Sequence, residues 1–277
     1  MFQNIKEYVA NKKLELKSKI IDKNLKLVII QVGNVEASNR YVKNKIKDCE
    51  EVGINCELIK LDENVLEAEV LGLVNKLNFD KTVTGYIVQL PLPKHISEER
   101  ITAAIDPKKD ADGFHPLSKT FPATPQGIIT YLEDNNYDFT NKNAVVIGRS
   151  NIVGRPIARM LLDRSCNVSV IHSKTGGANK NTLLMNADLI ICATGHRNTI
   201  TDKDLTKIEF DMIDQATKRY HNTRAFIVDV GININEEGKL CGDCENVTVC
   251  EKTPVPGGVG LLTRLALLEN LIKLAGE

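Results

Sequence analysis

The sequence of 277 residues contains no tryptophan, and aromatic residues make up only 5% of it. It has no excess charge, because 36 lysines and arginines balance 36 aspartates and glutamates. This balance gives no electrostatic reason to expect binding to nucleic acid or to an anionic membrane. No apolar run approaches the ~18 residues of a membrane span, and the charged N-terminal stretch lacks the apolar core of a secretion signal. We therefore expect a cytoplasmic protein without nucleic-acid or membrane partners.

The seven cysteines form no pattern typical of a disulfide framework. Most lie in apolar stretches such as ADLIICATG (187–195), which is typical of reduced thiols in a cytosolic protein. Cys241 and Cys244 form the one C-x-x-C pair, without a second pair or a suitably spaced histidine. We expect no metal site and ordinary packing for these two residues, with a redox or metal role as the alternative.

Helical and strand patterns alternate along most of the chain. The expected strands are short and apolar, at residues 26–32, 55–61, 83–93, 143–148, 167–173, 187–195 and 225–232. Longer amphipathic segments separate them, at residues 4–20, 39–53, 65–78, 125–136, 152–164 and 261–276, with one short helix after 173. Strands separated by helices of this length indicate βαβ units and parallel sheets that are covered on both faces.

The alternation breaks at DPKKDADGFHPLSKTFPATP (106–125), which is rich in proline, aspartate and glycine and has no period. A long irregular segment inside a compact protein is usually functional or a linker. We expect both: a site loop that carries Asp110 and Asp112, followed by a domain boundary. The segment EKTPVPGGVG (251–260) interrupts the pattern again, just before the last helix.

A nucleotide-binding turn is indicated where a strand runs into RSNIVGRP (149–156) and a helix opens. Such a turn directs backbone N–H groups and the positive end of the helix at a phosphate. Gly148 would permit the tight turn, and Gly154 the close approach of helix and sheet. Ser150 and Asn151 could donate to a phosphate or cap the helix. The spacing departs from G-x-G-x-x-G, so a plain strand–helix turn is the alternative.

The next strand indicates which dinucleotide would bind. Units that bind NAD place an acidic residue about 20 positions downstream, where it accepts from the ribose 2′-hydroxyl. Here the strand ends in VIHSKT, which has no acid. His172, Ser173 and Lys174 could bind a 2′-phosphate through hydrogen bonds and positive charge, together with Arg149 from the turn. We therefore expect NADP, and the alternative is that these are solvated surface residues.

The helix expected at 39–53 carries a candidate general base. Val42, Ile46 and Cys49 stand at helical spacing and should form its buried stripe. Tyr41 and Lys45 are one turn apart along the edge of that stripe. A lysine that is partly desolvated beside a tyrosine is suited to acid–base work, and an ordinary surface lysine is the alternative.

A second candidate lies at the end of the strand GYIVQLPLP (85–93). Ligands of open α/β sheets bind beyond the carboxyl ends of the strands, which is where Gln89 stands. The two prolines that follow remove competing N–H donors and stiffen the exit.

These segments occur in a recognisable order: SNRYVKNKIKDCEEVGI, GYIVQLPLP, DPKKDADGFHP, TPQGI, VVIGRSNIVGRP, HSKT, VDVGIN and TPVPGGVG. The set resembles the bifunctional methylenetetrahydrofolate dehydrogenase/methenyltetrahydrofolate cyclohydrolase family from about residue 38 to residue 269. The resemblance implies an α/β fold of two domains with a cleft between them. Residues 1–121 would form the folate-binding catalytic domain, joined by a C-terminal helix at 258–277, and residues 122–257 a Rossmann-type NADP-binding domain.

The resemblance also implies a function. The chain would oxidise 5,10-methylenetetrahydrofolate with NADP and hydrolyse the 5,10-methenyl product to 10-formyltetrahydrofolate, in one-carbon metabolism, as a homodimer. Retention of only one of the two activities is the nearest alternative. A non-catalytic NADP-binding sensor and a dehydrogenase of another small acid are more distant ones.

Site residues follow from the same resemblance. Lys45 would be the catalytic lysine, held by Tyr41 and Gln89, and Asp112 would complete the catalytic set by binding the pterin ring. The expected folate-side residues are Tyr41, Gln89, Leu90, Asp112, Pro256, Gly257 and Gly260. The expected cofactor-side residues are Gly148, Arg149, Ser150, Ile152, His172, Ser173, Thr194 and Ile232.

The sequence departs from the family pattern at three places. Leu261 and Leu262 replace the usual Pro-Met after PGGVG, which bears on packing at the folate side. Residues 207–224 are longer than the corresponding family segment and could alter the cofactor rim or a dimer contact. The C-x-x-C at Cys241 and Cys244 lies where the family usually has no such pair.

Overall fold

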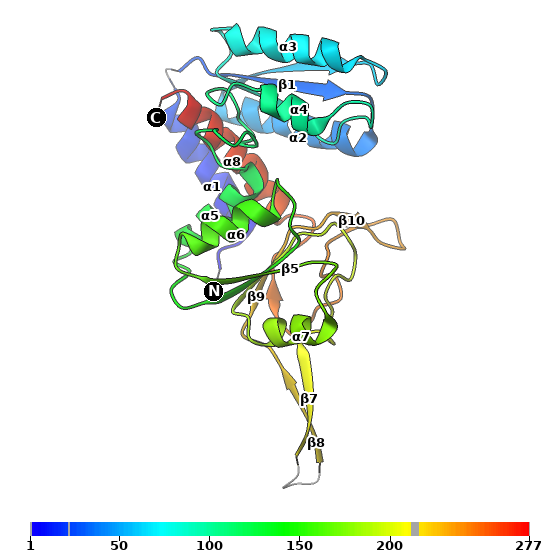
Figure 1. Ribbon diagram of the computed structural model, residues 1–277. Coiled ribbons are helices and arrows are strands. Elements are labelled where there is room, and N and C mark those ends of the chain that lie inside the picture. The colour runs from blue at the N-terminus through cyan, green and yellow to red at the C-terminus, as the bar shows by residue number, and fades with distance from the viewer. Residues whose placement is uncertain (1, 22, 212–215, 277) are drawn as a thin grey trace. The chain divides into compact units, whose positions relative to one another are not determined.

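Figure 1 shows the computed structural model, which describes residues 2–21, 23–211 and 216–276, without the side chains of residues 37 and 207–219. Packing divides the chain into two units, and each is assembled from separate stretches of sequence. Residues 7–123 and 263–277 form the three-stranded unit. Residues 1–6 and 124–262 form the five-stranded unit. Residues 2–6 thus pack with the second half of the chain.

The three-stranded unit contains a parallel sheet with the strand order β2-β1-β3. Its strands are β1 (Lys26–Val32), β2 (Asn55–Leu61) and β3 (Gly85–Val88). Its helices are α2 (Glu36–Val52), α3 (Glu67–Phe79), α4 (Glu98–Ala104) and most of α1 (Ile5–Lys19) and α8 (Val259–Leu274). The bounds of β1 and β2 are those that the sequence predicts, whereas α4 was not predicted.

Side chains alternate across the sheet and give it two buried faces. Val28, Ile30 and Val32 pack against residues of α3 and α4, which cover one face. Side chains of α8 pack closely on the sheet at β3, because a Cβ built on Gly85 would lie 2.9 Å from Leu271 Cδ1. Parallel sheets are buried on both faces in this way because helices connect their strands.

The five-stranded unit contains a parallel sheet with the strand order β12-β9-β6-β4-β5. Its strands are β4 (Asn143–Ile147), β5 (Asn167–Ile171), β6 (Leu189–Cys192), β9 (Phe226–Asp229) and β12 (Glu251–Lys252). One face packs against α5 (Ala123–Asp134) and α6 (Gly154–Leu162). The other packs against α7 (Gly177–Met185) and against residues from 200–205 and 244–250.

The strand order reverses direction at the carboxyl ends of β4 and β6. From β4 the chain passes to β5 on one side, and then to β6 on the other side of β4. Connections that leave neighbouring strands in opposite directions open a crevice at this point, where ligands of doubly wound sheets bind. The expected α/β fold with two domains, the second of Rossmann type, is confirmed.

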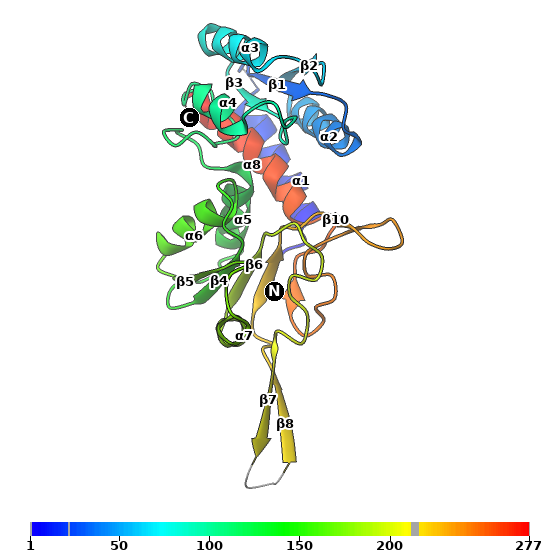
Figure 2. The same cartoon turned by 45° about the vertical axis from the view of Figure 1, so that its right-hand side comes forward.

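Two small antiparallel pairs interrupt the alternation of helices and strands. The hairpin of β7 (Thr206–Asp211) and β8 (Ala216–His221) extends away from the five-stranded sheet, as Figures 1 and 2 show. It accounts for most of the long segment 207–224. The second pair, β10 (Asn233–Ile234) and β11 (Leu240–Cys241), follows β9 directly. Among the described residues, no helix is long and apolar enough to cross a bilayer.

Candidate functional site

Lys45 is a buried side chain with one neutral hydrogen-bond acceptor. On α2, Val42 and Cys49 are buried as expected, whereas Ile46 is only half-buried. Lys45 itself is only 9% exposed. Its Nζ donates to Gln89 Oε1 at 3.1 Å, and Gln89 Nε2 donates to the Leu90 carbonyl at 2.7 Å, which fixes the orientation of the amide. The structure therefore brings the predicted lysine and glutamine together.

A buried carboxylate on the same helix anchors α2. Asp48 is 3% exposed and forms ion pairs with Lys13 of α1 and, at 2.7 Å, with Arg264 of α8. Arg264 also donates to the Asn44 carbonyl at 3.2 Å. Removing one member of a buried ion pair is strongly destabilising, because the other charge stays buried. These pairs fix the helix, and hence Lys45, relative to two other elements of the unit.

Tyr41 lies one turn before Lys45 and is half-buried. Burial raises the pKa of its phenol, and the positive charges of Arg264 and Arg40 oppose that rise. The hydroxyl is therefore kept protonated and can act as a hydrogen-bond donor beside the lysine.

The two aspartates of the loop DADGF have different tasks. Asp110 is 1% exposed, and its carboxylate accepts from the backbone N–H of Gly113 and of His115 at 3.0 and 2.8 Å. Asn270 of α8 donates to the carbonyls of Ala111 and Phe121, each at 2.9 Å. Asp110 thus shapes the loop from within, and α8 holds it from outside.

Asp112 is the aspartate that remains available to a ligand. Its side chain is half-buried. Within the described part of the chain, its carboxylate accepts no hydrogen bond. Burial raises the pKa of this carboxyl, and the positive charge of Lys45 partly opposes the rise. The charge of Lys45 thus acts on Asp112, and we group Asp112 with Lys45 and Gln89 on this basis.

The other expected folate-side residues belong to the five-stranded unit. Pro256 is exposed, and Gly257 has a φ of +95°, with Lys6 Cε 3.0 Å from the position of a Cβ. Gly260 has open space where a Cβ would stand. Only Gly257 therefore has a local conformational reason to be glycine.

The nucleotide turn after β4 requires glycine at two positions, because a Cβ atom would clash with the backbone there. Gly148 has a φ of +116°, and a Cβ there would lie 2.3 Å from the Ala193 carbonyl oxygen. A Cβ on Gly154 would lie 2.4 Å from the Gly148 carbonyl oxygen. Ser150 Oγ accepts from the N–H groups of Val153 and Gly154 at 3.2 and 3.3 Å, so in this structure it caps α6. The helix begins two residues later than predicted, at Gly154.

Cationic and hydrogen-bond-donating side chains occur in the turn and after β5. The segment that follows β5 contains no acidic residue. Arg149, Ser173 and Lys174 are exposed, and His172 is half-buried with its Nδ1 accepting from the Lys174 N–H at 3.2 Å. Ile152 is 40% exposed. These exposed groups would suit an anionic ligand.

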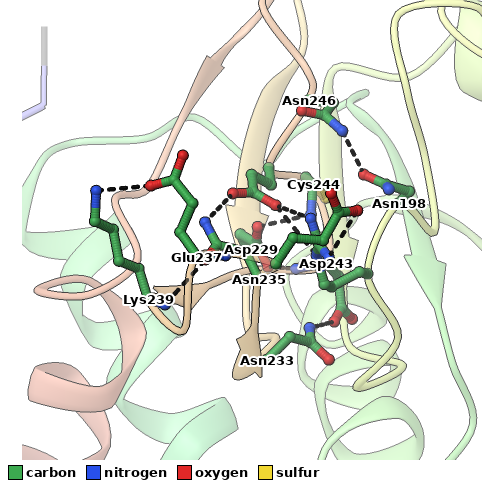
Figure 3. A network of polar contacts seen from close by, with 12 residues as sticks. Asn198, Asp229, Asn233, Asn235, Glu237, Lys239, Asp243, Cys244 and Asn246 are labelled. Atoms are coloured by element: carbon green, nitrogen blue, oxygen red, sulfur yellow. Dashed lines mark hydrogen bonds and ion pairs between the residues drawn. The ribbon is translucent and has the colours of Figure 1, made fainter.

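The remaining expected cofactor residues stand at the ends of β6 and β9. Thr194 follows β6 and is half-buried, and Ile232 follows β9 and is 48% exposed. Figure 3 shows the polar network that lies between these strand ends. The sequence alone did not identify Asp243, which is the centre of this network. One signal was present: in CGDC (241–244) the aspartate stands between two small residues, shortly after the predicted ligand loop GIN (231–233).

The C-x-x-C cysteines are both buried. Cys244 is part of the core on the α7 face of the sheet, where its thiol and burial raise the pKa of Cys192. Within the described ranges, no group of three or more histidine, cysteine, aspartate or glutamate side chains is placed to hold a metal ion.

Two family models match the chain. Residues 1–112 match the catalytic domain of tetrahydrofolate dehydrogenase/cyclohydrolase, and residues 122–277 match its NAD(P)-binding domain. The chain belongs to the tetrahydrofolate dehydrogenase/cyclohydrolase family. The family assignment made from the ordered segments is thereby confirmed.

Individual relatives match over nearly the whole chain. The bifunctional protein FolD of Agathobacter rectalis is 43% identical over 282 residues, covering 97% of this chain and 94% of that protein. The FolD protein of Paracidovorax citrulli is 43% identical over 262 residues, covering 90% of this chain and 86% of that protein. The crystal structure of the bifunctional enzyme FolD from Campylobacter jejuni superposes with a TM-score of 0.88 at 40% identity, covering 99% and 98% of the two chains.

Proposed function

We propose that this chain oxidises 5,10-methylenetetrahydrofolate to the 5,10-methenyl compound with NADP⁺ and hydrolyses that product to 10-formyltetrahydrofolate. The observation that carries the proposal is the buried Lys45 ammonium on Gln89 Oε1, with Asp112 in the same electrostatic cluster. It occurs in a chain whose second domain matches an NAD(P)-binding model. Family membership supports both activities, and the cluster supports the residues that would perform them.

The oxidation needs positioning more than acid–base chemistry. Loss of hydride from the methylene carbon leaves a cation that the two flanking nitrogens stabilise, so no side chain has to remove a proton. The cofactor, when bound, supplies the hydride acceptor. Asp112 would accept from the N–H donors of the pterin ring, and burial of this carboxylate strengthens such a hydrogen bond. Pro256, Gly257 and Gly260 are the proposed folate contacts of the five-stranded unit.

The hydrolysis needs proton transfers, and we assign these to Lys45. Water attacks the methenyl carbon and loses a proton, and the ring nitrogen that leaves must gain one. Lys45 Nζ is buried and has one protein acceptor, Gln89, so it can serve as the acid–base group. Tyr41, whose phenol stays protonated, would orient the substrate or the water.

Residues of the five-stranded unit fit NADP. The Cβ-free contacts at Gly148 and Gly154 let backbone approach a pyrophosphate. Ile152, Thr194 and Ile232 would line the rest of the site. Arg149, His172 and Ser173, without an acid at the end of β5, favour a 2′-phosphate over a free 2′-hydroxyl. This supports NADP over NAD.

Two further proposals rest on the family resemblance: a homodimer and a cytoplasmic location. A chain that retains only one activity is the second candidate function, because Leu261 and Leu262 depart from the family pattern. Leu262 is buried and its carbonyl carbon lies 2.7 Å from a Cβ built on Gly127. The Leu262 side chain is therefore part of the buried core, and the backbone of α8 packs closely on Gly127.

A spectrophotometric assay tests the proposal. The purified protein is mixed with 5,10-methylenetetrahydrofolate and either NADP⁺ or NAD⁺, and reduced cofactor is followed before and after acid converts 10-formyl product to the methenyl compound. We expect rapid reduction of NADP⁺ and a methenyl signal that appears only after acid. Accumulation of methenyl compound without acid would mean that the hydrolase activity is missing, and no reduction of either cofactor would overturn the proposal.

A further inference from the structure

Asp243 is a fully buried carboxylate whose hydrogen bonds converge on a single pair of loops. It is 0% exposed and lies between β11 and β12. Its Oδ2 accepts from the Thr194 N–H at 2.7 Å, the Thr194 hydroxyl at 2.9 Å and the Gly195 N–H at 3.0 Å. Its Oδ1 accepts from Asn233 Nδ2 at 2.9 Å, as Figure 3 shows. Each of these partners donates, so the carboxylate is saturated.

The loops that Asp243 joins border the proposed nucleotide site. Thr194 and Gly195 follow β6, and Ala193, just before them, contacts the nucleotide turn at Gly148. Asn233 follows β9, next to the exposed Ile232. The carboxylate therefore links the carboxyl ends of two adjacent strands, on the crevice side of the sheet.

A second buried carboxylate fixes Asp243 in turn. Asp229 ends β9, and its oxygens accept from the N–H groups of Gly231, Asp243 and Cys244 at 2.9–3.0 Å. Burial raises the pKa of Asp229, and these backbone donors oppose that rise. Gly231 and Gly242 are both required here, because a Cβ on either would lie 2.0 Å from a carboxylate oxygen of Asp243 or Asp229. The two aspartates and the two glycines thus form one hydrogen-bonded, closely packed group.

We propose that Asp243 is a positioning residue for the dinucleotide: it holds the Thr194–Gly195 loop and the Asn233 loop in the spacing that receives the cofactor. This inference rests on the proposed function and deepens it. Two backbone N–H groups and a hydroxyl are held by one carboxylate, so their direction is set before the ligand arrives. Preorganised contacts of this kind improve affinity by reducing the ordering cost of binding.

The test compares Asp243→Ala, Asp243→Asn and Thr194→Val with the native protein. Binding of NADP⁺ and of NAD⁺ is measured by calorimetric titration, the KM for the cofactor by reduction kinetics, and cyclohydrolase activity on methenyltetrahydrofolate without any dinucleotide. Asp243→Ala removes both acceptor atoms. We expect binding to weaken about 10- to 100-fold, as for the loss of hydrogen bonds to a charged group, with cofactor KM rising in parallel.

The conservative variant distinguishes positioning from general stability. Asp243→Asn keeps one oxygen for Thr194 and Gly195, and the amide of Asn233 can turn to accept from the new NH₂ group. We expect it to recover most of the affinity. Thr194→Val removes, at constant volume, a hydroxyl that donates to Asp243 and accepts from the His196 N–H, and it should weaken binding less than Asp243→Ala. These two variants carry the test if Asp243→Ala does not fold, as judged by its circular dichroism.

Asp202→Ala is the matched control. Asp202 also accepts from three donors of a neighbouring loop, at Thr248 and Val249, and none of them is a proposed cofactor residue. It should leave dinucleotide binding unchanged.

The inference is overturned if folded Asp243 variants bind the dinucleotide as tightly as the native protein. It is also overturned if cyclohydrolase activity falls in proportion to binding, because the role would then be structural. If the native protein binds NAD⁺ instead of NADP⁺, the proposed cofactor is wrong, and the Asp243 comparison is made with NAD⁺.

Discussion

The Lys45 cluster and the nucleotide turn contrast in how their polar groups are satisfied. Lys45 is buried with one neutral acceptor, and Asp112, on which its charge acts, is half-buried. Around the nucleotide turn, Ser150 caps a helix and Asp243 is saturated by donors. The first region leaves reactive side chains with spare hydrogen-bonding capacity, and the second uses side chains to fix backbone.

This difference suits the tasks that we propose for the two regions. A group that must exchange protons needs unsatisfied capacity and a perturbing environment. A site that only binds a ligand gains affinity from rigid backbone donors, because these groups are already ordered in the folded protein and lose little entropy on binding. Substitutions should therefore act on rates in the first region, and on affinity and stability in the second.

The largest effect is expected from Lys45→Met, which removes the proposed acid–base group at similar volume. Cyclohydrolase activity should fall by about 10²- to 10⁴-fold, the usual contribution of such a group. Hydride transfer needs no proton removal, so part of the dehydrogenase activity should remain and methenyl product should accumulate. Stopped-flow absorbance in the near ultraviolet measures both steps.

Lys47→Met is the control for this experiment, because Lys47 is on the same helix and its side chain is 71% exposed. Its activities should match those of the native protein. Native-rate hydrolysis by Lys45→Met would show that another residue performs the proton transfers.

Gly148→Ala should have the next largest effect, on stability and binding together. The added Cβ would meet the Ala193 carbonyl at 2.3 Å at a φ of +116°, and backbone strain of this kind costs about 1–3 kcal/mol. Gly176→Ala is the matched control, since a Cβ there meets nothing within 4 Å and φ is −64°. Urea unfolding and NADP⁺ titration compare the two. Equal behaviour would mean that the turn adapts.

Arg149→Ala should affect one cofactor only. Loss of a charge-assisted contact to the 2′-phosphate should weaken NADP⁺ binding about tenfold, whereas NAD⁺, which lacks that phosphate, should bind unchanged. The ratio of KM values for the two cofactors measures this selectivity. A native protein that uses both cofactors equally would contradict the assignment of Arg149, Ser173 and His172 to the phosphate.

The smallest effect is expected on the pH dependence of stability. Burial raises the pKa of Asp112, so its ionisation costs stability as the pH rises through the folded pKa, above the ordinary value of about 3.9. Asp112→Asn cannot ionise and should melt a few degrees higher than the native protein at pH 7. The gap should shrink toward pH 4. The gain in stability should accompany loss of activity.

For Asp80→Asn we expect a change in stability of the opposite sign. Hydrogen bonds from Thr82 lower the pKa of this exposed carboxyl, so its contribution to stability is present at neutral pH and lost as the pH falls through the folded pKa. This variant should melt slightly lower than the native protein at pH 7, and the two should converge in acid. The same direction for both variants would show that burial does not dominate at Asp112.

Local patterns predict most of the fold, because buried parallel strands and their covering helices each have a clear period. The strands at 26–32 and 55–61 are correct to the residue. The β7–β8 hairpin was not predicted, since a two-stranded pair that projects from its sheet has no apolar face large enough to mark it. Helix α4 has only seven residues, too few for a helical period to be visible.

The candidate site was predictable where residue type and position along an element suffice, as for Lys45 and Gln89. The residues that support it were not, because their partners are remote in sequence. Asp48 lies 35 residues from Lys13 along the chain, and farther still from Arg264. Asp243 is separated from Thr194 by 49 residues. Only the folded chain identifies these acids as anchors.

The position of α8 in the chain has a consequence for biosynthesis. Through Arg264 and Asn270, this helix holds both the Lys45 helix and the Asp112 loop, yet residues 124–262 are translated between that loop and the helix. At about 5–20 residues per second, a ribosome takes on the order of ten seconds to cover this distance. Throughout that interval the nascent three-stranded sheet has emerged without its closing helix, and the side of β3 at Gly85 is uncovered. The residues proposed to be catalytic are thus made early and aligned last.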